Sequence, residues 1–390
     1  PVSDQREMDR IQFFIEKNLI AESDVVCSTL ISSARGNMLD FDFDYVFIDE
    51  ASQANQMVSL IPLIHHPSKL VLLGDHRQLD AHVPDELKQM HPDTTKSLYK
   101  KLLLKNIQHV RLTTQFRMNP KIAEFPNNEF YDGMIKNADG IEKNTSTELE
   151  GIITPIMFVD VNDGNEKKIY GSTFINFKEL ETIEILLNNL KKNQIPAIQV
   201  GVITPYHGQV EKIRRIIDKL KYTGVKASSV DNFQGSERDF IILSLVRTNQ
   251  NGNFGFLPNN KRINVSLTRA RKGIMIVGNF NAFVSRNSCQ DPRNQVLVDL
   301  CNFYEKNKAV VNYKSLKKID VLIQKPNKNS KKLDIRVHNI VNILKQNPGM
   351  KIRTKMCVKL INMLTLLNMF LMMMTMMINY IFLDITNTIK

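Results

Sequence analysis

The chain alternates between short, wholly apolar runs and longer segments that carry one apolar face. Five runs end abruptly in polar, acidic or glycine residues: 45–48, 70–73, 200–203, 240–243 and 274–277. Because these runs contain no polar alternation, both faces of their sheets are predicted to be covered. Between them, residues 177–190 and 210–220 have a helical pattern. This order predicts an α/β fold with parallel sheets, whose ligands bind at the carboxyl ends of the strands.

Changes in pattern and composition predict four segments. A first lobe is expected at 1–106, a second at 107–320, a basic linker at 321–350 and a hydrophobic, Met-rich tail at 351–390. Part of the tail, 360–383, carries no charge and is long enough to span a bilayer. Three interpretations stay open for it: a membrane anchor, a helix packed on the second lobe, or out-of-frame or intronic sequence in a faulty gene model.

The charge balance favours a polyanionic partner. The 390 residues carry a formal net charge of +12, which favours nucleic acid first and an anionic membrane surface second. A solvated basic face without a partner is the alternative. The four cysteines form no close pair, so neither a disulfide framework nor a zinc site is predicted. A reducing compartment follows, and the cytoplasm is expected, with the nucleus as the alternative.

Two acids follow the first apolar run. Phosphoryl transfer needs a carboxylate that holds Mg²⁺, usually through water, and a group that orients or deprotonates the attacking water. Asp49 suits the first task and Glu50 the second. Gln78 follows the second run and can sense the γ-phosphate and its water. The alternatives are two acids on a loop and an ordinary surface turn.

The second lobe opens with Phe116 and Arg117. Arg117 can reach the γ-phosphate as an arginine finger, and Phe116 can stack on a base, although core packing would explain Phe116 equally well. Farther on, Thr204, Pro205 and Tyr206 follow a buried strand, where hydroxyls and backbone amides suit contacts to a nucleic-acid backbone. An ordinary helix start with Pro205 in its first turn is the alternative.

Residues 231–237 and 264–271 carry the most informative pattern. In the first block, Gly235 allows a tight loop with its neighbour Gln234, and Glu237 can accept a ribose hydroxyl. In the second block, Arg269 can meet the phosphates while Arg271 braces the loop. A loop held by structural salt bridges is the alternative. Taken together with the upstream blocks, the pattern is far more specific than any one of them.

In their order along the chain and in their residues, these blocks resemble the superfamily 1 helicases of the 5′-to-3′ branch, especially the nonsense-mediated-decay RNA helicases. The resemblance runs from about residue 23 to about residue 311 and implies two RecA-like lobes of the P-loop NTPase type, with ATP and Mg²⁺ as cofactors. It makes 1–106 the C-terminal part of an incomplete first lobe, which contains the Walker B region.

The resemblance also implies residue roles. Asp49 and Glu50 would be the Walker B pair, Gln78 the phosphate sensor, and Arg117 and Arg269 two arginine fingers. The remaining roles follow the same comparison: Ser28 and Thr29 would contact nucleic acid from the first lobe, Phe116 stands where the family usually has a base-stacking tyrosine, and Glu237 stands at the ribose-contacting acid. The implied activity is ATP-driven 5′-to-3′ translocation on single-stranded nucleic acid, with RNA favoured over DNA.

One part of the family pattern is not in this chain. No G-x-x-x-x-G-K-[ST] occurs in the 390 residues, and the first glycine is Gly36. Without the amides and lysine of that loop, the β- and γ-phosphates lose their main cradle. We therefore expect this chain alone neither to hydrolyse ATP nor to unwind. A second departure is Asp80-Ala81, where the family commonly has prolines.

Two functions of different classes remain open. The first is the C-terminal part of an ATP-dependent helicase, acting on RNA or, as a variant of the same hypothesis, on DNA. The second is an ATPase-inactive module that only binds nucleic acid. The chain begins with Pro1 rather than Met, which favours a longer parent protein or a gene model that begins late. Regulatory proteins would bind outside this chain, and a membrane would be a partner only if the tail is an anchor.

Overall fold

The computed structural model describes residues 2–81, 83, 85–90, 96–105, 107–145 and 155–319. Pro1–Gln324 form one compact unit, while the second unit, Lys325–Lys390, lies outside the described residues. The predicted linker and tail, with the three interpretations of the tail, therefore lie outside them as well. Within the described part, no helix is both long enough and apolar enough to cross a membrane.

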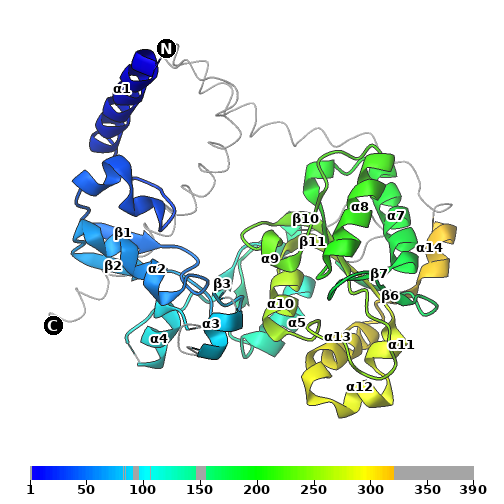
Figure 1. Ribbon diagram of the computed structural model, residues 1–390. Coiled ribbons are helices and arrows are strands. Elements are labelled where there is room, and N and C mark those ends of the chain that lie inside the picture. Colours follow the sequence, from blue (N-terminus) through cyan, green and yellow to red (C-terminus); the bar gives the residue numbers. More distant parts are fainter. Residues whose placement is uncertain are drawn as a thin grey trace. The chain divides into compact units, whose positions relative to one another are not determined.

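The chain builds a small first sheet and a larger second one (Figure 1). The elements up to residue 104 are α1 (Val2–Ala21), η1 (Ser32–Ala34), η2 (Gly36–Asp40), β1 (Tyr45–Ile48), α2 (Gln56–Leu60), η3 (Ile61–His65), β2 (Lys69–Leu72), α3 (Asp85–Met90) and α4 (Leu98–Leu104). Strands β1 and β2 pair in parallel. The boundary between lobes near residue 106 stays a prediction.

The remaining elements are β3 (Thr114–Gln115), α5 (Pro120–Phe130), β4 (Lys136–Asn137), α6 (Ile141–Thr145), β5 (Ile156–Asp160), β6 (Glu166–Lys168), β7 (Phe174–Asn176), α7 (Phe177–Lys192), η5 (Ala197–Gln199), β8 (Val200–Ile203), α8 (His207–Lys219), β9 (Lys226–Ser228), α9 (Val230–Phe233), β10 (Arg238–Ser244), α10 (Asn260–Leu267), β11 (Ala270–Gly278), α11 (Phe280–Phe283), α12 (Arg286–Gln290), η6 (Pro292–Asn294), α13 (Gln295–Lys306), β12 (Val310–Asn312) and α14 (Tyr313–Ile319).

The larger sheet is parallel throughout its six strands, in the order β12-β5-β11-β10-β8-β9. Along β10, Ile241 and Leu243 join one apolar cluster, while Phe240 and Ile242 join another. Side chains of a strand alternate between its two faces, so a run without polar residues is needed to bury both. Helices α7 and α8 belong to the second cluster, and α10 and α13 to the first (Figure 1).

Coverage of the first sheet is different. Tyr45 in β1 is 54% exposed, and no residue of β2 is fully buried. The expectation that both faces are covered is therefore correct for the six-stranded sheet and wrong for the described part of β1 and β2. The α/β fold with parallel sheets is confirmed in both.

The polar blocks lie where helices and strands begin or end. The block 231–237 begins in α9, whose N-cap Ser229 accepts a hydrogen bond from the amide of Asn232. The block 264–271 runs from α10 into β11, and Asn259 caps α10 by accepting from the amide of Arg262. In the first sheet, Asp49 and Glu50 directly follow β1, and Gln78 lies in the loop after β2. The predicted site residues thus lie in the loops that connect strands to helices.

Candidate nucleotide site and nucleic-acid face

The two acids after β1 lie on a tightly bent loop. The backbone of Glu50 has φ 50°, in the left-handed region that non-glycine residues rarely adopt. Its amide donates to Asp49 Oδ1 at 2.9 Å. Its carboxylate oxygen Oε2 accepts from Gln53 Nε2 at 3.0 Å and from Gln234 Nε2 at 3.3 Å. Glu50 is therefore held both by its own loop and by the block 231–237, which is 184 residues away in sequence.

The loop after β2 packs closely on the loop after β1. A Cβ added at Gly74 would lie 2.9 Å from the backbone nitrogen of Ser52, so this position has no room for a side chain. Next to it, Asp75 organises the loop: its Oδ2 accepts from Gln78 Nε2 at 2.9 Å, and its Oδ1 accepts from the amide of Arg77 at 2.8 Å. The close approach therefore packs the loop that carries Gln78 against the loop that carries the acids.

Arg269 is the most deeply buried of the predicted site residues that carry a charge. It is 2% exposed, and its guanidinium donates to the carbonyl of Val265 at 3.0 Å and to Thr268 Oγ1 at 2.9 Å. A third donation reaches Gln78 Oε1 at 3.5 Å, which joins residues 191 positions apart. Burial, followed by the charge of Arg117, lowers the pKa of Arg269 to about 10. The side chain stays a cation at neutral pH.

Arg117 and Glu237 form an ion pair in which Arg117 Nε donates to Glu237 Oε2. Arg117 also donates from Nη1 to the carbonyl of Thr268 at 3.3 Å, and Arg271 Nη1 lies 3.8 Å from Glu237 Oε1. The sequence had assigned Arg117 to a phosphate and Glu237 to a ribose. In this structure the two side chains are partners of each other, and both lie near Arg269.

Together, these contacts gather the predicted nucleotide-site residues. Glu50 meets Gln234, Gln78 meets Arg269, and Arg117 meets Glu237. Gly235, next to Gln234, has φ 70° and open space where a Cβ would stand, so its backbone conformation rather than crowding favours glycine. Blocks that are distant in sequence therefore form one polar cluster with acids, amides and guanidinium groups.

Asp49 is suited to a hydrated metal ion. Its side chain is exposed, and Oδ1 accepts a backbone amide while Oδ2 accepts no hydrogen bond from the residues that the structure describes. Among the described residues, no group of three or more His, Cys, Asp or Glu side chains lies close enough to hold a metal by itself. A single exposed carboxylate fits Mg²⁺ that keeps most of its water and phosphate ligands, as Mg²⁺ commonly does.

Two predicted nucleic-acid contacts, and the predicted nucleotide-binding residue Phe116, are open to solvent. Ser28 and Thr29 lie between α1 and η1, and both are exposed; Thr29 Oγ1 donates to Ser32 Oγ at 2.8 Å. Phe116 is 60% exposed, which rules out the alternative that it is a core residue. An exposed aromatic ring of this kind is available for stacking on a base.

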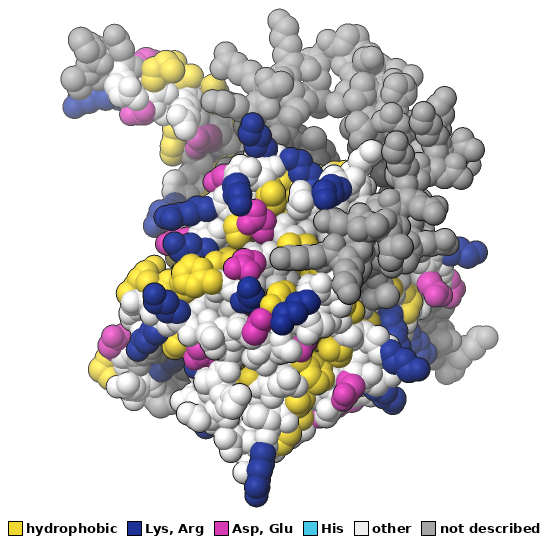
Figure 2. Space-filling view, turned by 90° about the vertical axis from the view of Figure 1, so that its right-hand side faces the viewer, with side chains coloured by type: hydrophobic (Ala, Val, Ile, Leu, Met, Phe, Trp, Pro, Cys, Tyr) yellow, Lys and Arg dark blue, Asp and Glu magenta, His cyan; other side chains and the backbone are white. Residues whose placement is uncertain are grey.

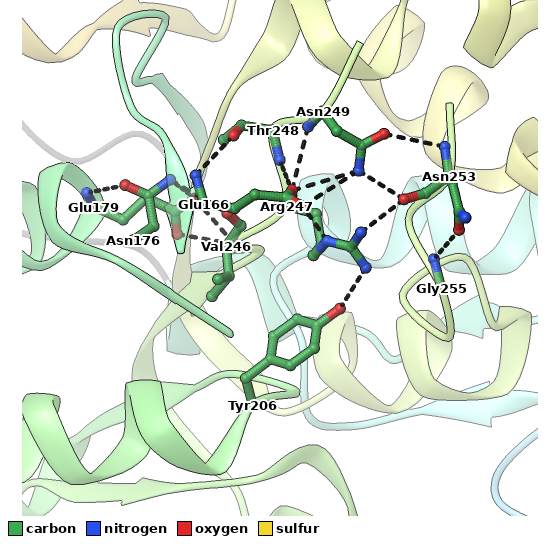
Figure 3. A network of polar contacts seen from close by, with 10 residues as sticks. All are labelled: Glu166, Asn176, Glu179, Tyr206, Val246, Arg247, Thr248, Asn249, Asn253 and Gly255. Atoms are coloured by element: carbon green, nitrogen blue, oxygen red, sulfur yellow. Dashed lines mark hydrogen bonds and ion pairs between the residues drawn. The ribbon is translucent and has the colours of Figure 1, made fainter. Parts of the chain in front are cut away.

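The other predicted contacts are buried. Thr204 is 0% and Tyr206 1% exposed, while Pro205 between them is half-buried. Figure 3 shows the Tyr206 hydroxyl accepting from Arg247 Nη1 at 3.4 Å, and Arg247 Nε in turn donates to Glu166 Oε2 at 3.0 Å. In this conformation, Thr204 and Tyr206 contribute to the interior behind the strand end, and their predicted contact with nucleic acid stays a prediction.

Two polar residues of the cluster were not foreseen from the sequence. The hydroxyl of Tyr131 donates to Asp75 Oδ2 at 2.6 Å and accepts from Asn264 Nδ2 at 2.8 Å. Asn264 also donates to the carbonyl of Arg77 at 3.1 Å. Asn264 belongs to a block that the sequence singled out, but it had no role there. Tyr131 follows a helix in an unremarked stretch, and no pattern around it pointed to a site.

Comparison with known proteins identifies the family of the chain. Two family models, each described as "AAA domain", match residues 3–85 and 94–281, which together cover more than half of the chain. A regulator of nonsense transcripts 1 homolog from Arabidopsis thaliana is 35% identical over 287 residues, covering 71% of this chain and 23% of that protein. The ATP-dependent helicase NAM7 from Saccharomyces cerevisiae is 37% identical over 289 residues, covering 71% of this chain and 29% of that protein.

An uncharacterized ATP-dependent helicase from Methanocaldococcus jannaschii is 33% identical over 287 residues, covering 70% of this chain and 42% of that protein. The parallel α/β sheets and the two matches to AAA domains agree with RecA-like lobes and place the chain in the helicase class. Within that class, the chain belongs to the superfamily 1 helicases related to regulator of nonsense transcripts 1. It spans less than half the length of each of these three relatives.

Proposed function

We propose that the chain supplies the second lobe and part of the first lobe of an ATP-dependent helicase that moves 5′-to-3′ on single-stranded RNA. One observation carries this proposal: Glu50 and Gln78, which follow two different strands, each accept a hydrogen bond from a later block, Glu50 from Gln234 and Gln78 from Arg269. A loop held only by structural salt bridges would need neither an acid after β1 nor a glutamine after β2. The family relationship supports the same function.

In this proposal, each residue of the cluster has a chemical task. Glu50 orients or deprotonates the attacking water, and Gln78 holds that water against the γ-phosphate. Asp49 would hold Mg²⁺, which neutralises charge on the phosphates. Arg269 presents a cation that is already desolvated, so its attraction to phosphate is not weakened by water. Glu237 would turn from Arg117 to a ribose hydroxyl, which frees Arg117 for the phosphates.

Nucleic acid would pass over the exposed residues of the first lobe, while Phe116 would stack on the base of the nucleotide. Ser28 and Thr29 offer hydroxyls to the phosphate backbone, and Phe116 offers an exposed ring to a base. RNA is favoured over DNA by the names of the relatives, which include regulators of nonsense transcripts. A cytoplasmic or nuclear location and regulatory partners that bind outside this chain complete the proposal.

The second candidate function is a module that binds nucleic acid without hydrolysing ATP. Its support is the absence of G-x-x-x-x-G-K-[ST] from the 390 residues. The retained Glu50, Gln78 and Arg269 cluster favours the helicase, because a module that only binds nucleic acid has no use for a sensor and a buried arginine. A phosphate loop encoded upstream of residue 1 would decide for the helicase, and its absence from the complete gene would decide for the module.

The test measures RNA-stimulated ATP hydrolysis by this chain and by the complete gene product. We expect no turnover from the chain and turnover from the complete protein. Glu50→Gln in the complete protein should lower kcat by at least about 100-fold while ATP still binds, because the amide cannot take a proton from water. Glu124→Gln is the matched control, since Glu124 is a surface residue that pairs with Lys121. Full turnover in the Glu50→Gln protein would remove Glu50 from the mechanism.

A further inference from the structure

Tyr131 joins the second-lobe blocks to the loop that carries Gln78. It directly follows α5, and the chain then turns through Asp132 and Gly133, which have φ 55° and 70°. This turn ends the helix and leaves the ring half-buried against the apolar cluster of the six-stranded sheet. The packing fixes the ring, so the position of its hydroxyl is fixed as well.

The hydroxyl of Tyr131 shares an acceptor with Gln78. Asp75 Oδ2 accepts from Tyr131 at 2.6 Å and from Gln78 Nε2 at 2.9 Å. The carboxylate therefore transmits the position of Tyr131 to the amide of Gln78. Gln78 Oε1 is left free to face Arg269 Nη2, at 3.5 Å. A carboxylate can only accept hydrogen bonds, so Asp75 holds the nitrogen end of the Gln78 amide. The oxygen end therefore faces Arg269.

Asn264 fixes Tyr131 from the other side. Its Nδ2 donates to the Tyr131 hydroxyl at 2.8 Å and to the Arg77 carbonyl at 3.1 Å, so the phenol must use its own hydrogen toward Asp75. Asn264 is 0% exposed, and its Oδ1 has no hydrogen-bond partner among the described residues. A buried amide with an unpaired oxygen is costly, which is unusual for a residue that serves packing alone. Burial and Asp75 both raise the pKa of Tyr131, so its hydroxyl keeps the proton it donates.

We propose that Tyr131 is a positioning residue that orients the phosphate-sensing Gln78 through Asp75, and that Asn264 sets the direction of its hydrogen bond. The catalytic part of this inference rests on the proposed function, whereas the structural part does not. When Tyr131 moves away from Asp75, Gln78 loses its orientation and no longer holds the attacking water against the γ-phosphate. The position of the second-lobe blocks is thereby coupled to the readiness of the nucleotide site.

The structural part is tested by hydrogen exchange on the 390-residue chain. Tyr131→Phe keeps the ring and removes only the hydroxyl. The amides of Arg77 and Gln78, which donate to Asp75 Oδ1 and to the Asp75 carbonyl, should then exchange about tenfold faster, since a hydrogen bond to a charged group is lost beside them. Asp75→Asn removes the negative charge of the acceptor itself and should also speed exchange at these two amides. Unchanged exchange at both amides in both variants would overturn the proposal.

Two controls separate positioning from general loosening. Tyr313→Phe removes a hydroxyl that lies 2.5 Å from Asp163 Oδ2, a matched tyrosine–aspartate pair away from the cluster. Lys261→Met removes a different contact to the loop region, from Lys261 Nζ to Asp80 Oδ1 at 2.5 Å. Both variants should leave exchange at Arg77 and Gln78 unchanged. An equal increase with Lys261→Met would show that any loosening of this contact region has the same result, which contradicts a specific role for Tyr131.

The catalytic part is tested by a double-mutant cycle in the complete protein. Tyr131→Phe should lower kcat by roughly 10- to 100-fold with KM for ATP changed less than about twofold, because orientation rather than binding is lost. In a Gln78→Ala background, the same substitution should have no further effect. Independent, additive losses would overturn the proposal. If the parent protein has no ATPase activity, the proposed function fails, while the exchange experiment still decides the role of Tyr131.

Discussion

At the scale of single residues, the candidate site is held together by contacts among the residues that would bind the ligand. Arg117 and Glu237 pair with each other, and Arg269 lies against Gln78. Charged groups held this way are already positioned and partly desolvated, so a ligand that replaces their partners meets little further cost of ordering. In the proposed mechanism, Arg117 and Glu237 would exchange their contact with each other for contacts to the nucleotide.

Glu179 offers a residue-scale prediction outside the site. It is fully buried in α7, and its carboxylate accepts the amide of Val246 at 2.9 Å and lies 2.6 Å from Ser244 Oγ (the Val246 contact is drawn in Figure 3). Burial raises its pKa from 4.5 to about 8, with Ser244 and Val246 offsetting part of the shift. Between these two values, the folded chain keeps a proton that the unfolded chain has lost. Stability therefore falls as pH rises through this window.

We expect Glu179→Gln to remove this loss, because an amide does not titrate. The free energy of unfolding of the parent chain should decrease relative to the variant by up to about 1.4 kcal/mol per pH unit between pH 5 and pH 8. Urea unfolding at several pH values measures the difference directly. Glu181→Gln is the control on the same helix, since Glu181 is exposed and pairs with Lys178. Parallel pH profiles for the parent chain and Glu179→Gln would contradict the prediction.

Site residues that lie within the recognised sequence blocks could be predicted from the sequence, whereas a site residue outside the blocks could not. Glu50, Gln78 and Arg269 were singled out from polar residues at strand ends, and the structure brings them together. Tyr131 was missed because it acts through a carboxylate 56 positions away, a contact that no local pattern records. Tyr206 is the opposite case. Its place after a strand predicted a contact with nucleic acid, but its side chain is buried.

At the scale of elements, apolar runs located strands accurately but did not give their neighbours. The predicted run 200–203 is β8, and 240–243 lies inside β10. Strand β5 pairs with both β11 and β12, yet it fell in a stretch where no motif was recognised. Strand order depends on which helices cross over the sheet, and this information is spread over the whole chain rather than held in any one run.

Strand β8 and helix α9 approach each other closely at Gly201. A Cβ added at Gly201 in β8 would lie 2.5 Å from Phe233 Cζ and 2.8 Å from Ile241 Cδ1. Phe233 is 0% exposed and directly precedes Gln234, so it cannot move without shifting the block 231–237. Gly201→Ala should lower the free energy of unfolding by about 1–3 kcal/mol, as overpacking of a core does, measured by thermal or urea unfolding.

The second substitution Phe233→Leu tests this cause. It shortens the side chain that meets the new methyl group, so the double variant should be less destabilised than the sum of the single variants. A coupling of about 0.5–3 kcal/mol is expected for residues in direct contact. Additive losses would show that the cost of Gly201→Ala arises from the strand itself and not from Phe233.

At the scale of the whole molecule, positive charge is in excess. Figure 2 shows Lys and Arg side chains spread over one face of the molecule, with acidic side chains among them. The net charge of +12 belongs to the entire sequence, which includes the Lys-rich segment 321–350 outside the described residues. A spread of this kind attracts a polyanion over a long path and contributes little to base recognition, which needs contacts to base edges.

Binding of single-stranded RNA by the 390-residue chain should therefore weaken steeply with salt. Each phosphate that a lysine or arginine neutralises releases counterions, so the logarithm of the association constant falls by about 0.7 per phosphate for each tenfold rise in salt. Fluorescence anisotropy with a labelled homopolymer, titrated between about 50 and 200 mM salt, gives this slope and hence the number of phosphates contacted. A strand of the same bases on an uncharged backbone is the matched control, and its weaker binding should hardly respond to salt, because only stacking remains. An RNA affinity that does not change over this range would show that the positive charge serves a different partner.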